Sequence, residues 1–165
     1  MKKENDLIDA LVADWKIERP ELDVDAMQIV GRVLKLGKIM ENRASLALKE
    51  NGIYYTDLDV LATLRRSGKP YQLSPKQLMQ SVVITSGAMT ALLNRLTKLD
   101  LIYRSTDEND GRISLAGLTD KGKEIIDEAI QKRFDEAKNS IQILNEKEQQ
   151  DLSILLKKLL IELEE

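Results

Sequence analysis

Cysteine and histidine are both absent from this chain of 165 residues. Without cysteine there is no disulfide, no thiol redox switch and no thiolate metal site. Without histidine the chain lacks the commonest general base and the commonest transition-metal ligand, which excludes serine–histidine hydrolases, cysteine proteases and zinc proteases. The sequence also shows no glycine-rich phosphate loop and no pair of carboxylates in an apolar setting. We therefore expect neither an enzyme nor a bound metal or cofactor.

Long apolar runs are lacking too, and aromatic residues make up only 4% of the chain. No stretch approaches the roughly 18 apolar residues of a membrane span, so no membrane partner is expected. The segment from Met1 to Asp14 is too acidic and too broken for a signal peptide, which predicts a cytoplasmic protein. With 42% hydrophobic and 32% charged residues, the composition is that of a helical globular protein.

The net charge of −3 is divided unevenly along the chain. The segment from Val60 to Arg104 carries seven basic residues against a single acid, Asp100. The first 25 residues and the segment from Asp135 to Glu165 each carry eight acids against four bases. A basic middle between acidic ends favours a central module that binds a polyanion, flanked by solvated helical arms. The alternative is that the basic residues cluster by chance on a solvated face.

Hydrophobic periodicity predicts long helices towards both ends of the chain. The second of these helices and the last, with its leucine stripe from Leu152 to Leu163, have wider apolar surfaces than one small domain can cover. This surplus of apolar surface predicts a dimer. The predicted helices are 4–17, one capped by Asp23 or Asp25 that runs to about Glu50, 120–144 and 145–165.

The middle of the chain predicts short helices followed by a β-hairpin. A capping box at Thr56–Asp59 opens the first helix, and Ser74 and Thr85 are N-caps of the next two. Two short helices and then a hairpin form the plan of a winged helix-turn-helix, a mainly α fold whose second short helix enters the major groove of DNA. The predicted elements are a helix from Thr56 to Gly68, an extended stretch over 70–73, helices over 75–81 and 86–99, and strands over 101–105 and 112–118 around a turn at 107–111.

The predicted helix over 86–99 suits the role of a recognition helix because its two faces differ. Its inward face is apolar, whereas its outward face is small, polar and slightly basic, which lets a helix approach base edges. In the hairpin, Arg112 supplies a cation near the wing tip for a phosphate or the minor groove. Asp110, two residues earlier and on the same face of a strand, would hold the guanidinium of Arg112 in one orientation. The outward residues of the helix are Ser86, Gly87, Thr90, Ala91, Asn94 and Lys98.

Four stretches carry a resemblance to a known family: LDVLATLRRSG, LSPKQL, TSGAMTALLNRL and LIYRSTDENDGRISLAGLTDKG. They resemble the MarR family of bacterial transcription regulators, over a span from about Gln28 to Lys158. The resemblance implies a homodimer held by the N- and C-terminal helices, a palindromic duplex operator and, usually, repression of neighbouring genes. It implies N-terminal dimerisation helices over 1–52, a winged helix-turn-helix over 53–118 and C-terminal dimerisation helices over 119–165. The residues expected to contact DNA are Ser74, Lys76, Gln77, Ser86, Gly87, Thr90, Asn94, Arg95, Asp110 and Arg112.

The chain departs from the family pattern at three places. Members commonly carry an arginine after the threonine of the recognition helix, where this chain has Ala91 and Leu92. Base reading would therefore depend more on the other outward residues and on DNA shape. The wing reads Asp110-Gly111-Arg112 in place of Asp-Arg-Arg, and Asp100 stands where a glycine is usual in the helix-to-strand turn.

A narrower resemblance rests on ADWKIERPELD near the N-terminus, together with Asp59 and Arg104. It is similar to the branch that answers urate and related phenolic or purine ligands, and it implies a small anionic aromatic or purine-like effector. It places Trp15, Asp59 and Arg104 as ligand or relay residues. Each also has a simpler interpretation. Trp15 would pack the first helix onto the body of the protein. Asp59 would be an acid in the first turn that the helix dipole favours, and Arg104 would contact phosphate or lie on the surface of a strand.

These observations predict a dimeric, sequence-specific DNA-binding repressor that a small effector releases. The alternative is a helical protein-interaction module that does not bind DNA. The basic segment argues against that alternative, and salt-dependent binding of duplex DNA would separate the two.

Overall fold

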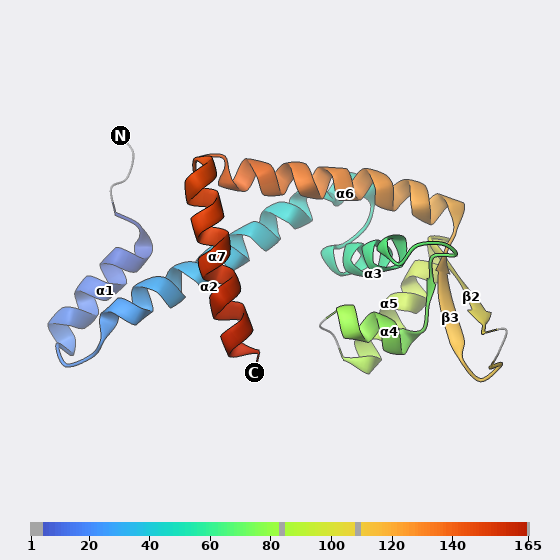
Figure 1. The fold of residues 1–165 in the computed structure, drawn as a ribbon, viewed down its shortest axis with the longest axis horizontal. Helices are drawn as coiled ribbons and strands as arrows, with labels where there is room; N and C mark the ends of the chain where they lie inside the picture. Colours follow the sequence, from blue (N-terminus) through green and yellow to red (C-terminus); the bar gives the residue numbers. More distant parts are fainter. Residues whose placement is uncertain (1–4, 83–84, 108–109, 165) are drawn as a thin grey trace. The chain divides into compact units, whose positions relative to one another are not determined.

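The structure, a computed structural model, describes residues 5–82, 85–107 and 110–164. The chain forms two compact units, Met1–Arg43 and Ala44–Glu165. Seven helices, one 3₁₀ turn and a small sheet account for the described elements, which confirms a mainly α fold (Figure 1). In chain order they are α1 (Leu7–Glu18), α2 (Val24–Ala47), η1 (Lys49–Asn51), α3 (Tyr55–Arg66), β1 (Gln72–Leu73), α4 (Pro75–Ser81), α5 (Ser86–Lys98), β2 (Ile102–Thr106), β3 (Ser114–Leu118), α6 (Asp120–Ile141) and α7 (Glu146–Leu163).

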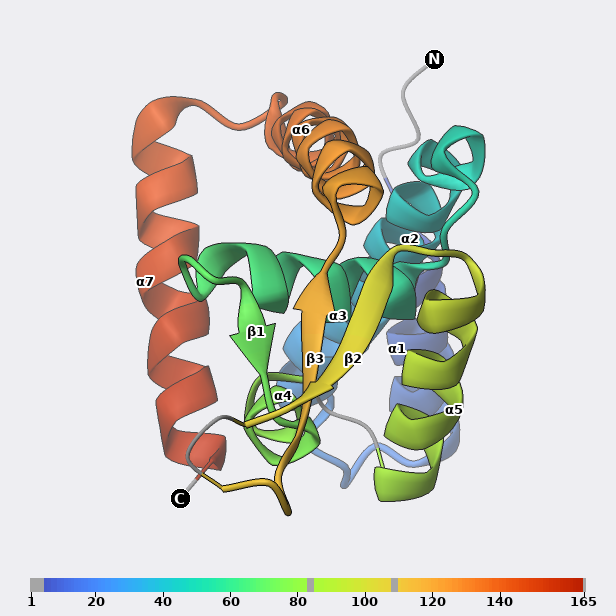
Figure 2. The same cartoon turned by 90° about the vertical axis from the view of Figure 1, so that its right-hand side faces the viewer.

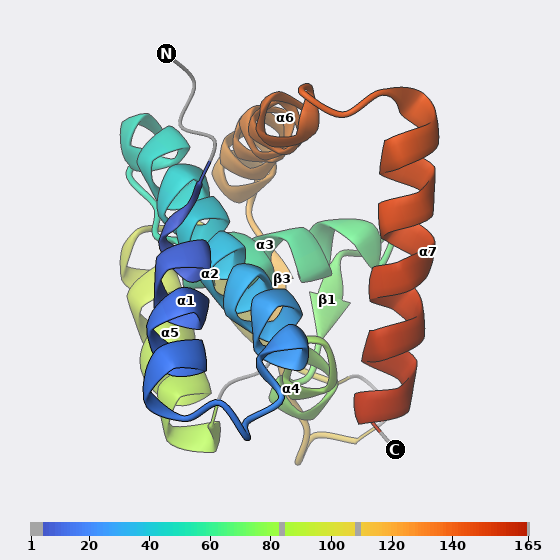
Figure 3. The ribbon, with the colours of Figure 1, turned by 90° about the vertical axis from the view of Figure 1, so that its left-hand side faces the viewer.

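In the first unit, α1 and the first part of α2 lie side by side (Figures 1 and 3). Asp6 caps α1 and, together with Asp9, binds the guanidinium of Arg32 on α2 at 2.8 and 2.5 Å. Gly31 allows the close crossing of the helices, because a Cβ there would lie 3.2 Å from the side chain of Ile8. Charged contacts and one small residue therefore fix this helical hairpin.

The hydrophobic core of the second unit lies among α3, α4, α5, the sheet and the start of α6. Leu61 and Leu64 of α3 are completely buried, as are Leu93 and Leu96 of α5. Gly122, in the first turn of α6, abuts β2, since a Cβ there would meet the carbonyl oxygen of Leu101 at 1.9 Å. The sheet and four helices thus share one packed centre.

Several helix boundaries differ from the sequence prediction, and three of the differences have a visible cause or extent. α2 ends at Ala47 because the chain tightens into η1, which stops at Gly52 in the left-handed region (φ 67°). α3 begins at Tyr55, so Thr56 is inside the helix. The backbone N–H of Tyr54 donates to the carboxylate of Asp57 at 2.7 Å, which makes Asp57 rather than Asp59 the acid of the capping box. α6 ends at Ile141, three residues earlier than predicted.

The sheet has three antiparallel strands in the order β1-β3-β2 (Figure 2), where the sequence predicted only a hairpin. The extended stretch before α4 supplies the third strand, with Gln72 opposite Gly117. The ring of Tyr103 on β2 covers Gly117, and its hydroxyl accepts a hydrogen bond from the amide of Gln72 at 2.6 Å. Asp100, in the turn before β2, takes the left-handed conformation (φ 58°) for which glycine is usual.

Among the described residues, no helix combines the length and the apolarity that a membrane crossing requires.

Candidate nucleic-acid interface

α4 begins at a capping box that also ties up two of the residues expected to contact DNA. The backbone N–H and hydroxyl of Ser74 donate to the side-chain carbonyl of Gln77 at 2.8 and 2.9 Å. The Ser74 hydroxyl in turn accepts from the backbone N–H of Gln77. Lys76 lies between them and is exposed. The first short helix therefore offers one exposed cation beside a fixed N-terminus.

α5 separates an apolar face from a small polar face, as the sequence predicted. Met89, Leu93 and Leu96 are buried against the core, although Leu99, also expected to face inward, is 37% exposed. The four outward residues expected to meet DNA are all exposed: Ser86, Gly87, Thr90 and Asn94. A Cβ at Gly87 would meet no described atom within 4 Å, so the first turn of α5 is open to a close partner.

The N-terminus of α5 carries no acidic residue in its first turn. Thr85 caps it by accepting from the backbone N–H of Ala88 at 3.3 Å. The remaining free N–H groups and the positive end of the helix dipole favour a negatively charged partner. A phosphate group is the anion that a DNA duplex would present there.

Arg95 differs from the expectation that it faces DNA. Its guanidinium forms an ion pair with the carboxylate of Asp57, which is completely buried at the start of α3. It also lies 4.2 Å above the centre of the Tyr54 ring. Arg95 is therefore engaged within the protein, and it is not among the residues that we propose to contact DNA.

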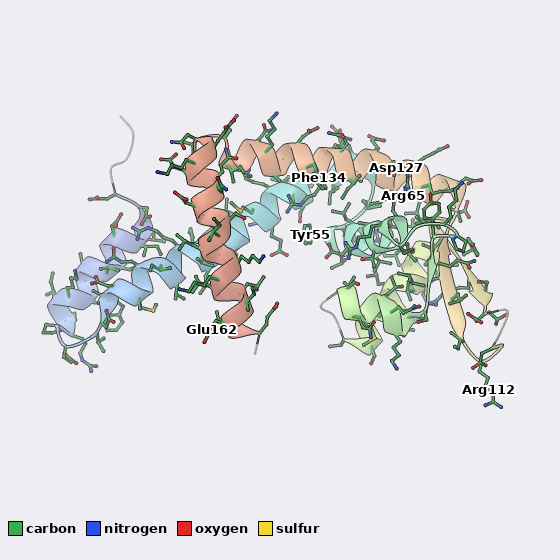
Figure 4. All side chains as sticks on the ribbon, in the orientation of Figure 1. Tyr55, Arg65, Arg112, Asp127, Phe134 and Glu162 are labelled. Carbon is green, nitrogen blue, oxygen red and sulfur yellow. The ribbon has the colours of Figure 1, made fainter. Side chains whose placement is uncertain are left out.

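The wing carries Arg112 at an exposed position, but Asp110 does not hold its guanidinium. β3 begins at Ser114, so both residues lie in the turn rather than on a strand. The carboxylate of Asp110 accepts from the backbone N–H of Arg112 at 3.0 Å. Figure 4 shows the Arg112 side chain extending away from the wing. Asp110 thus shapes the turn, and residues 108–109 of the predicted turn lie outside the described residues.

A second inter-helix contact joins α3 to α6. The guanidinium of Arg65 on α3 binds both carboxylate oxygens of Asp127 on α6 at 2.7 and 3.1 Å (Figure 4). It also donates to the hydroxyl of Tyr71 at 3.2 Å. No local signal in the sequence points to this ion pair, because the partner of Arg65 lies 62 residues further along the chain.

The three expected effector residues lie in different surroundings. Trp15 belongs to the first unit, while Asp59 and Arg104 belong to the second. Burial raises the pKa of Asp59, and the neighbouring cations Arg66 and Arg133 partly oppose that rise. Arg104 is exposed on β2, opposite Ala116. The convergence of these three side chains stays a prediction.

Each unit contains a cavity. One of about 410 Å³ lies between α1 and α2, with Trp15, several aliphatic side chains and the carboxyl-bearing Asp23 in its wall. The other, of about 490 Å³, lies where η1 leads into α3, and its wall includes two aromatic rings, Tyr54 and Tyr55, and two cations, Lys49 and Arg95. The described residues include no cluster of three or more acidic side chains placed to hold a metal ion.

Comparison with known proteins identifies similar regulators. A sequence model of the MarR family matches residues 51–113. The HTH-type transcriptional regulator PecS of Dickeya dadantii is 29% identical over 146 residues, which cover 88% of each chain. The crystal structure of wild-type MarR from E. coli, in its apo form, shares 26% identity, with a TM-score of 0.67 over 79% of this chain and 95% of that one. These relatives are transcriptional regulators, not enzymes.

A mutant MarR from E. coli, solved in complex with operator DNA, has the same fold. It is 23% identical to this chain, with a TM-score of 0.71 over 94% of this chain and 99% of that one. The likeness confirms the winged helix fold that the sequence predicted.

Proposed function

We propose that the chain is a transcriptional regulator of the MarR family, a homodimer that binds a palindromic DNA operator and represses transcription. The observation that carries the proposal is the exposed polar face of α5 beside an exposed arginine on the wing. A recognition helix reads bases in the major groove, while the wing adds a phosphate or minor-groove contact.

Base reading is assigned to the outward residues of α5. Ser86, Thr90 and Asn94 carry hydroxyl and amide groups that can donate to and accept from base edges. Gly87 lets the backbone approach the duplex closely, because no side chain stands in the way. Ser74, Lys76 and Gln77 of α4 and Asp110 in the wing remain proposed neighbours of the DNA backbone, with Lys76 supplying the charge.

Repression implies a signal that ends it, and we assign that signal to a small anionic aromatic or purine-like molecule. A ligand shifts a protein between two arrangements only through different affinities for them. The cavity lined by Tyr54, Tyr55, Lys49 and Arg95 offers aromatic walls and, besides the Arg95 already paired with Asp57, the cation Lys49, which together suit such an anion. The cavity lined by Trp15 holds a carboxyl-bearing residue, Asp23, and suits an anion less well.

The effector class is tested by operator release. Salicylate should release a bound operator duplex, whereas salicylamide, which has nearly the same shape but no carboxylate, should release much less. Fluorescence anisotropy of a labelled duplex measures both. Equal release by the two compounds would show that charge does not select the ligand. A change in the emission of Trp15, the single tryptophan, would place the ligand in the cavity of the first unit.

The DNA-binding role is tested at the wing. Arg112→Ala should weaken operator binding and reduce the slope of log affinity against log salt by about two per dimer, because each copy loses about one phosphate contact. The fold should be unchanged, since the side chain is exposed. Lys138→Ala removes an exposed cation from α6 and is the matched control, with affinity and slope unchanged.

If Arg112→Ala binds the operator with unchanged affinity and salt slope, the wing does not contact DNA. If the native chain binds no duplex at any salt concentration, the alternative of a protein-interaction module is favoured.

A further inference from the structure

We propose that Asp57 is a positioning residue for the recognition helix: it holds Arg95, and through Arg95 it fixes the orientation in which α5 presents its outward face to DNA. This inference rests on the proposed role of α5 in reading the operator. Neither residue touches DNA in this account, and the effect of Asp57 is transmitted through the helix.

The contact joins two elements that are far apart in the sequence. Asp57 lies in the first turn of α3, and Arg95 lies in the last turn of α5, 38 residues later. One carboxylate oxygen of Asp57 accepts both the guanidinium of Arg95 and the backbone N–H of Tyr54, the latter at 2.7 Å. The Arg95 guanidinium also stacks 4.2 Å above the Tyr54 ring. Two groups at the start of α3, the Asp57 carboxylate and the Tyr54 ring, therefore hold one side chain of α5.

The burial of Asp57 makes this contact costly to break. Its side chain is completely buried, and its second carboxylate oxygen has no hydrogen-bond partner among the described residues. Removing Arg95 would leave a buried carboxylate without its cation, whereas replacing both partners with neutral groups of similar volume often costs little stability. Stability alone thus gives little reason for an ion pair here. What distinguishes the ion pair from an apolar contact is that it depends on the relative orientation of its two groups.

Direction matters because the rest of the α5 interface is apolar. Met89, Leu93 and Leu96 contact the core through dispersion and hydrophobic forces, which depend weakly on angle. A charged hydrogen bond to a planar guanidinium does depend on angle. Asn94, next to Arg95, and Thr90, about a turn and a half earlier, lie on the exposed face. A small rotation of α5 about its axis would therefore move both away from base edges.

The test compares preference for operator with stability. The double variant Asp57→Asn/Arg95→Met removes both charges together, so it should melt within a few degrees of the native protein. Its affinity for a scrambled duplex should be unchanged. The operator is the duplex that the native chain selects from random sequences. The ratio of affinities for operator and scrambled duplex should fall by about tenfold or more in the double variant, as expected when base contacts are misaligned.

A second variant covers the case in which the double variant does not fold. Asp57→Asn alone keeps an oxygen that can accept from the Tyr54 N–H but loses the charge that holds Arg95. It should lower operator preference and speed amide hydrogen exchange in the last turn of α5, with little change in α4. Asp127→Asn is the matched control, because it breaks the ion pair of Arg65 between α3 and α6 and should leave operator preference unchanged.

An operator preference that survives in a folded double variant, or that falls equally in Asp127→Asn, would overturn the inference. A native chain that shows no preference for any duplex would instead overturn the proposed function.

Discussion

Asp59 illustrates at the residue scale how burial changes the acid-base behaviour of a carboxyl group. The folded protein raises its pKa through burial, against the opposing attraction of Arg66 and Arg133. The folded chain therefore binds this proton more tightly than the unfolded chain, whose pKa is about 3.9. Ionised Asp59 opposes folding, and this cost is absent below that pH and grows as the pH rises through the raised folded value.

Asp59→Asn should therefore raise stability relative to the native chain at pH 7 and have little effect near pH 3. Urea denaturation midpoints of both proteins at the two pH values measure the difference. If the variant has the same effect at both pH values, the burial of an ionised carboxyl group is not the cause.

The direction of the Arg95 side chain and the start of α3 could not be predicted from the sequence. Arg95 stands between an outward residue, Asn94, and an inward one, Leu96, so helical periodicity left its direction open. What decides the direction is Asp57, a partner 38 residues away. The sequence pattern predicted a capping box at Thr56–Asp59, but the register of the box depends on Tyr54, whose side chain carries no capping signal.

At the scale of elements, local signals predicted the parts that position the candidate site. Ser74-Pro75 and Thr85 mark the starts of α4 and α5 where the structure has them, because N-cap side chains act within three residues. β1 could not be recognised as a strand of the sheet. It has only two residues, and its partner β3 lies more than 40 residues later.

α7 carries the clearest unpartnered apolar surface. Leu152, Leu156, Leu159 and Leu163 follow one another at helical spacing, and each is more than 40% exposed. Exposed apolar patches of this kind mark interfaces, so we expect a second copy of the chain to cover α7. The sequence predicted a dimer from this same leucine stripe, and the dimer stays a prediction.

Leu159→Glu should weaken the dimer by roughly 100-fold or more, because a charge replaces, in both copies, a leucine that the proposed dimer would bury. Sedimentation at micromolar concentration should show the native protein at about twice 18.7 kDa and the variant shifted towards the monomer mass of 18.7 kDa. Lys157→Glu changes charge on the same helix and should leave the dimer intact. A native chain that sediments as a monomer would contradict the proposed assembly.

At the scale of the whole molecule, we propose a regulator that reads DNA with its second unit and dimerises through helices at the ends of the chain. The basic segment between Val60 and Arg104 indicated a polyanion partner before any fold was known. Arg65 and Arg95 then proved to be engaged in ion pairs within the protein. The charge of the segment was therefore a correct signal for the module but a poor guide to which cations contact DNA.

The most direct test of this account is selection of duplexes from a random library by the native chain, followed by binding measurements over a range of salt concentrations. A two-fold symmetric dimer should select a palindrome whose half-sites lie about one helical turn, 10–10.5 base pairs, apart. Affinity should fall linearly with log salt, and a scrambled duplex should bind far more weakly. Failure to enrich any sequence, or equal affinity for selected and scrambled duplexes, would contradict the claim that this protein is a sequence-specific DNA-binding regulator.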